Sequence, residues 1–422
     1  MLNHAVERVL QAYNDAVASL FLLAVVVCVL YLTTRVFHLT SKTTAPELFY
    51  CESDVNKKII DACPLLKKVY KPPPLWGKSG HIQTILYGTM GRINSPFPSG
   101  VRHSIIMSDK ATLTFDIFEP ENPHPDGEDC TLLVCPGIAN SSESMYIRTC
   151  VHYAQSQGFR VAVLNHLGAL KDVPLTSPRC FTYGNTEEYG LMLDKVAQLY
   201  PDSVPIAVGF SMGGNIILKY LGENKEHQTK VLCALCCCTG FDIALISASA
   251  QPFLRTWEHL RPMYIWAMTQ HQQILLRAHR DMVFGHEAKE QFGEFDEEKI
   301  FAATTMIEID ELYSRRRAGF SSVYKYYEWA SSVHYMHNIE IPMMILNTED
   351  DPIVPKELLD PAYKIASSRR DVIFAKTQHG GHLGFFEGGL VYPDTITWLD
   401  KIVVQYANAA LKTYRRSKLS AK

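Results

Sequence analysis

Apolar and polar residues repeat with different periods along this chain, and each change of period marks a different predicted element. Near the N-terminus, the nineteen residues 16–34 carry no charge and are almost wholly apolar. In a helix they rise about 28 Å, close to the thickness of the hydrocarbon core of a bilayer. A cleaved signal peptide would have a shorter apolar run and small residues before the cut, whereas this run ends in Tyr31-Leu-Thr-Thr-Arg35. The pattern therefore predicts an uncleaved single-pass membrane anchor.

The residues that flank this anchor leave its orientation open. Basic residues follow the span at Arg35 and Lys42, whereas Arg8 before the span is offset by acidic neighbours. Under the positive-inside rule this asymmetry favours a cytosolic position for the rest of the chain. The sequon Asn140-Ser-Ser142 would be used only on the lumenal side. We expect the anchor to lie in the plasma membrane or the endoplasmic reticulum.

From residue 101 onward, the pattern predicts strands that alternate with helices. Residues 101–107 and 112–118 alternate in polarity on either side of a turn, so they predict a β-hairpin. Short apolar runs then alternate with amphipathic segments. The predicted strands are 131–136, 160–165, 204–210, 231–238, 341–347 and 371–376, and the predicted helices are 145–157, 187–200 and 214–220. This order indicates the α/β class, with a mostly parallel sheet and helices on both faces.

One long insertion interrupts this alternation. Residues 240–338 are rich in helix formers, aromatic residues and charge, and they predict a helical cap. Together with the anchor, the insertion divides the chain into successive parts. These are an N-terminal tail (1–15), the transmembrane anchor (16–34), a connecting segment (35–100), the first part of the α/β core (101–240), the cap (241–338), the second part of the core (339–415) and a basic tail (416–422).

A serine at the junction of a strand and a helix is the candidate nucleophile. Ser211 lies in Gly209-Phe-Ser-Met-Gly213, directly after a predicted strand. A sharp corner there strains the serine backbone, and the neighbouring side chains must be nearly absent. This arrangement is a nucleophile elbow, and it points the amide of Met212 at a developing oxyanion. We expect a second amide donor from Ile138, in the loop after an earlier strand.

A serine hydroxyl needs a histidine to take its proton and a carboxylate to orient that histidine. In chains with this elbow, the acid and then the histidine follow the serine. Among the acids after strand 341–347 we prefer Asp351, because a proline fixes the turn after it; Asp350 and Glu349 are the alternatives. His382 is flanked by glycines after the last predicted strand and is preferred as the base, with His379 as its competitor.

Composition narrows the chemistry further. The 422 residues include 41 basic and 44 acidic side chains, a balance that gives no indication of nucleic-acid binding. Four of the 11 cysteines lie in the apolar run 231–238, where most are expected to be core thiols, and no C-x2-C pair repeats at zinc spacing. A serine–histidine–acid mechanism requires no metal or organic cofactor. The H-x4-D match from His124 to Asp129 is interpreted as a solvated turn rather than an acyltransferase motif.

Six stretches resemble the AB hydrolase 4 family, and the resemblance runs through most of the chain, including the anchor. They are Trp76-Gly-Lys-Ser-Gly-His-Ile-Gln-Thr84, Cys135-Pro-Gly-Ile-Ala-Asn140, Leu164-Asn-His-Leu-Gly-Ala169, Gly209-Phe-Ser-Met-Gly-Gly-Asn215, Asp350-Asp-Pro352 and His379-Gly-Gly-His-Leu-Gly-Phe-Phe-Glu387. The resemblance implies an α/β-hydrolase fold and a serine esterase, with Ser211 as nucleophile, Asp351 as orienting acid and His382 as base. It also implies monoacylglycerols of the 2-arachidonoylglycerol type as substrates, with activity on acetyl esters and triacylglycerols. The anchor of this family is commonly assigned with the catalytic body outside the cytosol, which disagrees with the charge asymmetry above.

Two functions of other classes stay open at this point. The fold would also suit a sensor that binds a regulatory lipid or steroid ligand, or an acyltransferase. Labelling by a fluorophosphonate probe separates an enzyme from a sensor, and the product ratio between water and a glycerol acceptor separates hydrolysis from transfer. The expected partners are a lipid ester substrate, the bilayer and a regulatory lipid or steroid, without nucleic acid.

Overall fold

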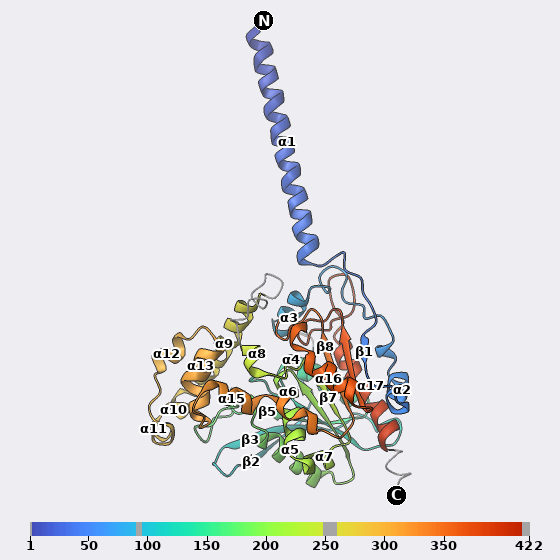
Figure 1. Cartoon of the computed structure of the whole chain (residues 1–422), viewed down its shortest axis with the longest axis vertical. Helices are drawn as coiled ribbons and strands as arrows, with labels where there is room; N and C mark the ends of the chain where they lie inside the picture. The colour runs from blue at the N-terminus through green and yellow to red at the C-terminus, as the bar shows by residue number, and fades with distance from the viewer. Residues whose placement is uncertain (1, 90–94, 248–259, 416–422) are drawn as a thin grey trace.

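The computed structural model describes residues 2–89, 95–247 and 260–415, and its body is one sheet covered by helices (Figure 1). Within those ranges, nine strands form the sheet in the order β1-β9-β8-β7-β6-β4-β5-β3-β2. Their bounds are β1 (Glu47–Phe49), β2 (Val101–Ile106), β3 (Thr112–Phe118), β4 (Cys130–Cys135), β5 (Arg160–Asn165), β6 (Val204–Phe210), β7 (Ala234–Cys237), β8 (Met343–Thr348) and β9 (Val372–Thr377). The strands β4 to β9 pair in parallel, and β1, β2 and β3 pair antiparallel at the two edges.

The burial of the central strands explains why their sequences predicted them closely. Every residue of β4, β5, β7 and β8 is buried. A parallel strand covered on both faces has a nearly continuous apolar sequence. Successive side chains point to opposite faces, so Leu133 and Ala207 belong to one core, whereas Leu132 and Ile206 belong to the other. The mostly parallel sheet is confirmed, although β7 is shorter than the predicted run 231–238.

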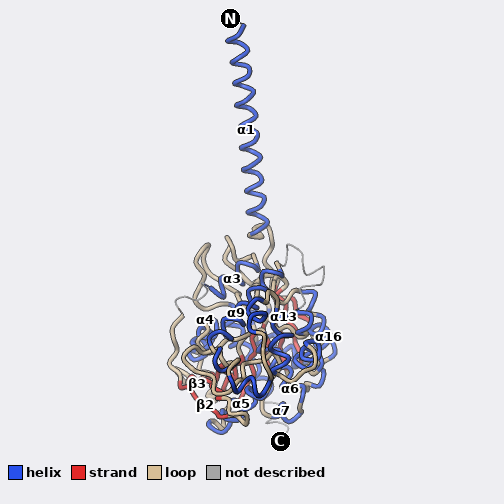
Figure 2. Tube along the Cα trace, turned by 90° about the vertical axis from the view of Figure 1, so that its left-hand side faces the viewer, coloured by secondary structure: helices blue, strands red, loops and turns tan. Residues whose placement is uncertain are grey.

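Helices cover both faces of the sheet, as the two views together show (Figures 1 and 2). The helices α5 (Glu187–Leu199), α6 (Met212–Glu223) and α16 (Asp360–Ser368) pack in the core that contains Leu133. The helices α2 (Asp54–Ala62), α4 (Met145–Ser156) and α17 (Trp398–Ala410) pack in the core that contains Leu132. A short helix, α7 (Lys225–Thr229), follows α6.

Residues 35–100, predicted as a connecting segment, contribute to the body in the structure. The strand β1 pairs with β9 and extends the sheet by one strand. Ile59 and Ile60 of α2 are buried in the core beside α17. The helix α3 (Gly80–Thr89) begins inside the stretch from Trp76 to Thr84. This segment lacks a clear strand pattern because β1 has only three residues and relies on a partner far along the chain.

The N-terminal helix α1 (Leu2–Val36) projects away from the body in both views (Figures 1 and 2). In the described part of the chain, its residues Tyr13–Val36 form the one helix long and apolar enough to cross a membrane, and its apolar window is not buried in the body. An N-terminal signal sequence would share these properties. The predicted anchor, 16–34, falls within this helix.

The insertion between β7 and β8 is helical (Figure 1). Its described helices are α8 (Ile243–Ser247), α9 (Arg261–Ala278), α10 (Arg280–Val283), α11 (His286–Phe292), α12 (Glu297–Ala302), α13 (Met306–Ile309), α14 (Arg315–Arg317) and α15 (Val323–Ala330). We call this insertion the cap. The predicted basic tail, 416–422, lies outside the described residues.

A buried carboxylate links the cap to the body. Asp310 is fully buried, and its oxygens accept hydrogen bonds from the hydroxyls of Ser314 (2.6 Å), Tyr327 (2.7 Å) and Tyr183 (3.3 Å). Burial raises the pKa of Asp310 to about 6, against the opposing effect of these three hydrogen bonds. Tyr183 comes from the loop before α5, so this cluster ties the cap to that loop.

We expect Asp310→Asn to make the stability of the protein less dependent on pH. The amide still offers an oxygen to the hydroxyls but cannot ionise. Because the pKa of Asp310 is about 6 in the folded state and about 4 in an unfolded chain, ionising the buried group destabilises the fold by up to about 3 kcal/mol. The unfolding free energy of the wild type therefore falls relative to the variant as the pH rises from about 4 to 6. Urea unfolding at two pH values measures this difference, and an offset that does not change with pH would contradict it.

Candidate active site

The corner after β6 holds Ser211 in an uncommon backbone conformation. Its φ is 54° and its ψ is -119°, and a positive φ is rare for a residue with a side chain. A Cβ at Gly209 would lie 2.5 Å from Cα of Gly214, and one at Gly213 would lie 2.0 Å from the carbonyl oxygen of Cys135. The corner therefore requires glycine on both sides of the serine. It places Ser211 at the carboxyl edge of the parallel strands.

The structure brings Ser211, His382 and Asp351 together in one hydrogen-bonded chain. His382 Nε2 lies 2.8 Å from Ser211 Oγ, and His382 Nδ1 lies 2.8 Å from Asp351 Oδ2. Asp351 follows β8 and His382 follows β9, so both approach the serine at the same sheet edge. The other carboxylate oxygen of Asp351 accepts the amides of Ile353 (2.7 Å) and Val354 (2.9 Å). These amides fix the carboxylate, which in turn fixes the imidazole.

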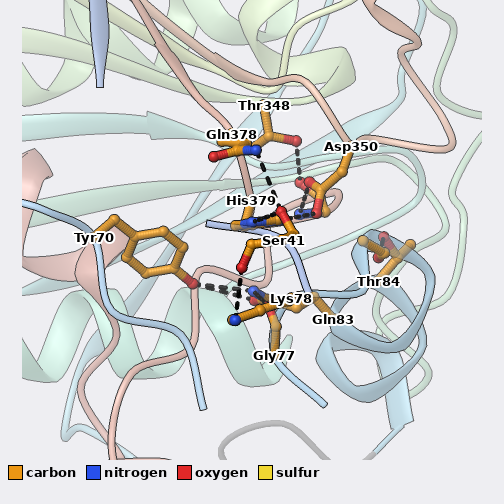
Figure 3. Close-up of polar contacts among 12 residues, drawn as sticks. Ser41, Tyr70, Gly77, Lys78, Gln83, Thr84, Thr348, Asp350, Gln378 and His379 are labelled. Carbon is orange, nitrogen blue, oxygen red and sulfur yellow. Dashed lines mark hydrogen bonds and ion pairs between the residues drawn. The ribbon is translucent and has the colours of Figure 1, made fainter. Parts of the chain in front are cut away.

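The alternative acids and histidine occupy other positions. His379 Nε2 contacts Ser41 Oγ at 3.0 Å, and His379 Nδ1 lies 3.4 Å from Asp350 Oδ2 (Figure 3). Glu349 Oε1 pairs with Lys356 Nζ at 3.2 Å. The geometry therefore favours the preferred acid and base over each of these competitors.

The two residues predicted to stabilise the oxyanion lie beside the serine. Ile138 and Met212 line the same cavity as Ser211. Met212 is the first residue of α6, and an amide in the first turn has no partner within its helix. The side-chain amide of Asn140 donates to the carbonyl oxygen of Ile138 at 2.5 Å, which turns that carbonyl toward Asn140.

Cys238 lies close to Asp351 and His382, and these three residue types can together bind a metal ion. Ligand atoms of Cys238, Asp351 and His382 all lie within 4.8 Å of one another. Burial raises the pKa of the Cys238 thiol well above its usual range, and a protonated sulfur is a poor metal ligand. The facing atoms of Asp351 and His382 already bond to each other. The donor set therefore suits a hydrogen-bonded chain better than a metal centre.

The cavity above Ser211 is apolar. The space between its walls, including the part open to solvent, is about 450 Å³. Its lining residues are Ile138, Tyr183, Ser211, Met212, Gly240, Ile243, Ile246, Ser247, Met268, Met306, Ile353 and Val354. Several of them come from the cap helices α8, α9 and α13. Within the described residues this lining includes no charged side chain, so the cavity suits a hydrocarbon chain next to a neutral polar group.

A residue that the sequence analysis did not single out supports the histidine from below. The amide of His382 donates to Thr84 Oγ1 at 2.8 Å, and Thr84 Oγ1 donates to the carbonyl oxygen of Gly80 at 2.7 Å. Both partners belong to α3, in the stretch from Trp76 to Thr84. The stretch from Trp76 to Thr84 carries part of the family resemblance, so the sequence marks it. The sequence does not show that Thr84 accepts a hydrogen bond from the amide of His382.

The interpretation of the H-x4-D match as a solvated turn is wrong for its histidine. His124 is buried, and its Nε2 lies 2.8 Å from Asn408 Oδ1 in α17. Asp129 Oδ1 accepts a hydrogen bond from Arg160 at 2.5 Å. Asp129 precedes β4, whereas Ser211 follows the parallel strand β6, so the match lies at the sheet edge opposite the serine. Its residues are therefore structural.

Comparisons with known proteins agree with this architecture. Residues 131–389 match the family model for the alpha/beta hydrolase fold. The chain is 46% identical over 389 residues to "Monoacylglycerol lipase ABHD2" of Mus musculus, covering 92% of this chain and 91% of that protein. It is 45% identical over 399 residues to the Homo sapiens protein of the same name, covering 94% and 93%. It is 27% identical to "Phospholipase ABHD3" of Homo sapiens, covering 89% and 87%.

Proposed function

Because this chain belongs to the alpha/beta hydrolase family, we propose that it is a lipid ester hydrolase whose catalytic triad is Ser211, His382 and Asp351. The observation that carries the proposal is the pair of 2.8 Å contacts that joins these three side chains below an apolar cavity. The resemblance read from the sequence is confirmed by the relatives above.

The geometry supports acyl transfer to the serine and then to water. Ser211 Oγ attacks the ester carbonyl while His382 Nε2 takes its proton, and Asp351 holds the imidazole in the reacting tautomer. The amides of Ile138 and Met212 stabilise the oxyanion. The C–O bond to the alcohol then breaks, and His382 gives the proton to the leaving oxygen. Water, deprotonated by His382, attacks the acyl-enzyme and releases the fatty acid with Ser211 restored.

The cavity supports a substrate with one acyl chain and a neutral head group. Among the described residues, its lining offers apolar side chains and no charged partner for a phosphate. A monoacylglycerol meets this description, and the relatives at 45–46% identity are named monoacylglycerol lipases. We therefore propose monoacylglycerols, including 2-arachidonoylglycerol, as the principal substrates. Acetyl esters fit the same cavity, and triacylglycerols are a further candidate.

The segment after α1 contacts the end of the sheet that carries the triad. Ser41, shortly after α1, contacts His379 in the loop after β9, which is the edge where Ser211 lies. The exposed apolar stretch 390–392 follows in the same loop region, and Trp76 Nε1 donates to it at 2.7 Å. We propose that α1 anchors the protein in the plasma membrane or the endoplasmic reticulum with this edge toward the bilayer.

We expect the purified full-length protein in detergent micelles to release fatty acid and glycerol from 2-arachidonoylglycerol. The rate should exceed that for a phosphatidylcholine with the same acyl chain by about tenfold or more, because the described part of the cavity lining offers no partner to a charged head group. Mass spectrometry of the products measures both rates, and a fluorophosphonate probe should label Ser211. Absence of both labelling and turnover would instead indicate a lipid or steroid sensor. Acyl transfer to glycerol that outpaces hydrolysis would indicate an acyltransferase.

A further inference from the structure

A second set of serine, histidine and aspartate side chains, Ser41, His379 and Asp350, lies close together (Figure 3). Ser41 Oγ is 3.0 Å from His379 Nε2, and His379 Nδ1 is 3.4 Å from Asp350 Oδ2. His379 is only 4% exposed. Ser41 lies in the segment that follows α1, away from any strand-to-helix corner. We therefore interpret its contact with His379 as structural, and Ser41 is not a second nucleophile.

The segment after α1 is held at several points. Lys78 Nζ donates to the carbonyl oxygens of Leu39 (3.1 Å) and Ser41 (2.7 Å). The side-chain amide of Gln378 donates to Ser41 Oγ at 3.3 Å. The contacts come from two elements, the stretch before α3 and the loop after β9. We call residues 39–42, with the contacts from Lys78 and His379, the juxtamembrane latch.

Asp350 connects the latch to the triad. Asp350 and Asp351 are consecutive, and Asp350 Oδ1 accepts the amide of Gly381, the residue before His382, at 2.8 Å. A Cβ at Gly381 would lie 2.4 Å from the carbonyl oxygen of Gly80, and one at Gly80 would lie 1.9 Å from that of Asp350. The backbone at Gly80 is therefore in direct contact with the backbone at Gly381 and at Asp350. A shift of one of these three segments displaces the other two.

We propose that the juxtamembrane latch positions the acid and base of the triad, so that seating of the segment after α1 sets the catalytic rate. This inference rests on the proposed function. Lys78, His379 and Asp350 act in it as positioning residues, since none of them contacts Ser211. The membrane anchor thereby affects catalysis as well as location.

The test compares Lys78→Met and His379→Asn in the full-length protein with matched substitutions elsewhere. Lys57→Met removes an exposed lysine that pairs with Glu52, and His227→Asn removes a histidine that contacts the carbonyl of Tyr220. Turnover of a soluble acetyl ester is measured per fluorophosphonate-labelled Ser211, so that unfolded molecules are not counted. We expect both latch variants to lose about tenfold or more in kcat with KM changed less than about threefold, because the cavity is intact. The two control variants should match the wild type.

Two further variants separate positioning from general packing. Lys78→Arg keeps donors for both carbonyls and should restore most of the rate. Ser41→Ala should lower kcat by a few-fold in the wild type and by clearly less in His379→Asn, because the two changes share the contact between Ser41 Oγ and His379 Nε2. Unchanged kcat in Lys78→Met and His379→Asn, or effects of Ser41→Ala and His379→Asn that multiply, would overturn the latch.

The failure of the proposed function looks different. A wild type that is labelled at Ser211 but turns over no ester contradicts the proposed function alone, because the labelling rate still reports whether the latch affects the nucleophile. A slower labelling rate in both latch variants, with the two control variants unchanged, would then still support the latch.

Discussion

Ser211→Ala is expected to lower ester turnover by about four orders of magnitude, to the level of the uncatalysed background. The nucleophilic oxygen is lost, and neither His382 nor the oxyanion amides supplies another one. The fold should survive, because alanine is smaller than serine. Both residues carry a Cβ, so the backbone strain at the positive φ of 54° is the same in the variant as in the wild type. Turnover of 2-arachidonoylglycerol and of an acetyl ester, together with the melting temperature, measures both effects.

Ser368→Ala is the matched control for this experiment. Its hydroxyl donates to the carbonyl oxygen of Ile365 at 3.0 Å, in a helix that contributes no residue to the triad. The control should keep wild-type activity. A Ser211→Ala protein that retained a tenth of wild-type turnover would exclude Ser211 as the nucleophile.

His382→Ala should lower turnover by about three orders of magnitude or more, because the group that accepts the serine proton is lost. His379→Asn should cost far less, since His379 reaches the triad only through Asp350 and the latch. The two variants differ in one side chain each, at positions three residues apart in the same loop. Steady-state kcat for a soluble acetyl ester ranks them, and equal losses or the reverse order would contradict the assignment of the base.

The sequence predicted the parts of the fold that depend on local pattern. The parallel strands have apolar sequences because both of their faces are covered, and the corner at Ser211 requires its glycines for steric reasons. The sequence places His382 after the last predicted strand, where the order of serine, acid and histidine requires the base. The choice of His382 over His379 rested on nearby glycines, whereas in the structure it rests on the 2.8 Å contact to Ser211.

The parts that the sequence did not predict depend on distant partners. Ser41 and His379 are 338 positions apart, so no local period reports their contact. The polar neighbours of His124 predict a solvated turn, yet the side chain is buried and contacts Asn408, 284 positions away. The strand β1 is defined by its pairing with β9, and three residues are too few to show a period of two.

The position of the triad edge relative to α1 changes the concentration that governs the reaction. An enzyme anchored with its triad toward the bilayer, as proposed above, meets substrate that diffuses in two dimensions. Its rate then follows the mole fraction of substrate in the surrounding leaflet, and adding inert lipid slows it even when the bulk concentration of substrate is constant. A Michaelis constant in molar units would then describe the vesicles of the assay as much as the protein, and surface dilution becomes the natural way to compare substrates.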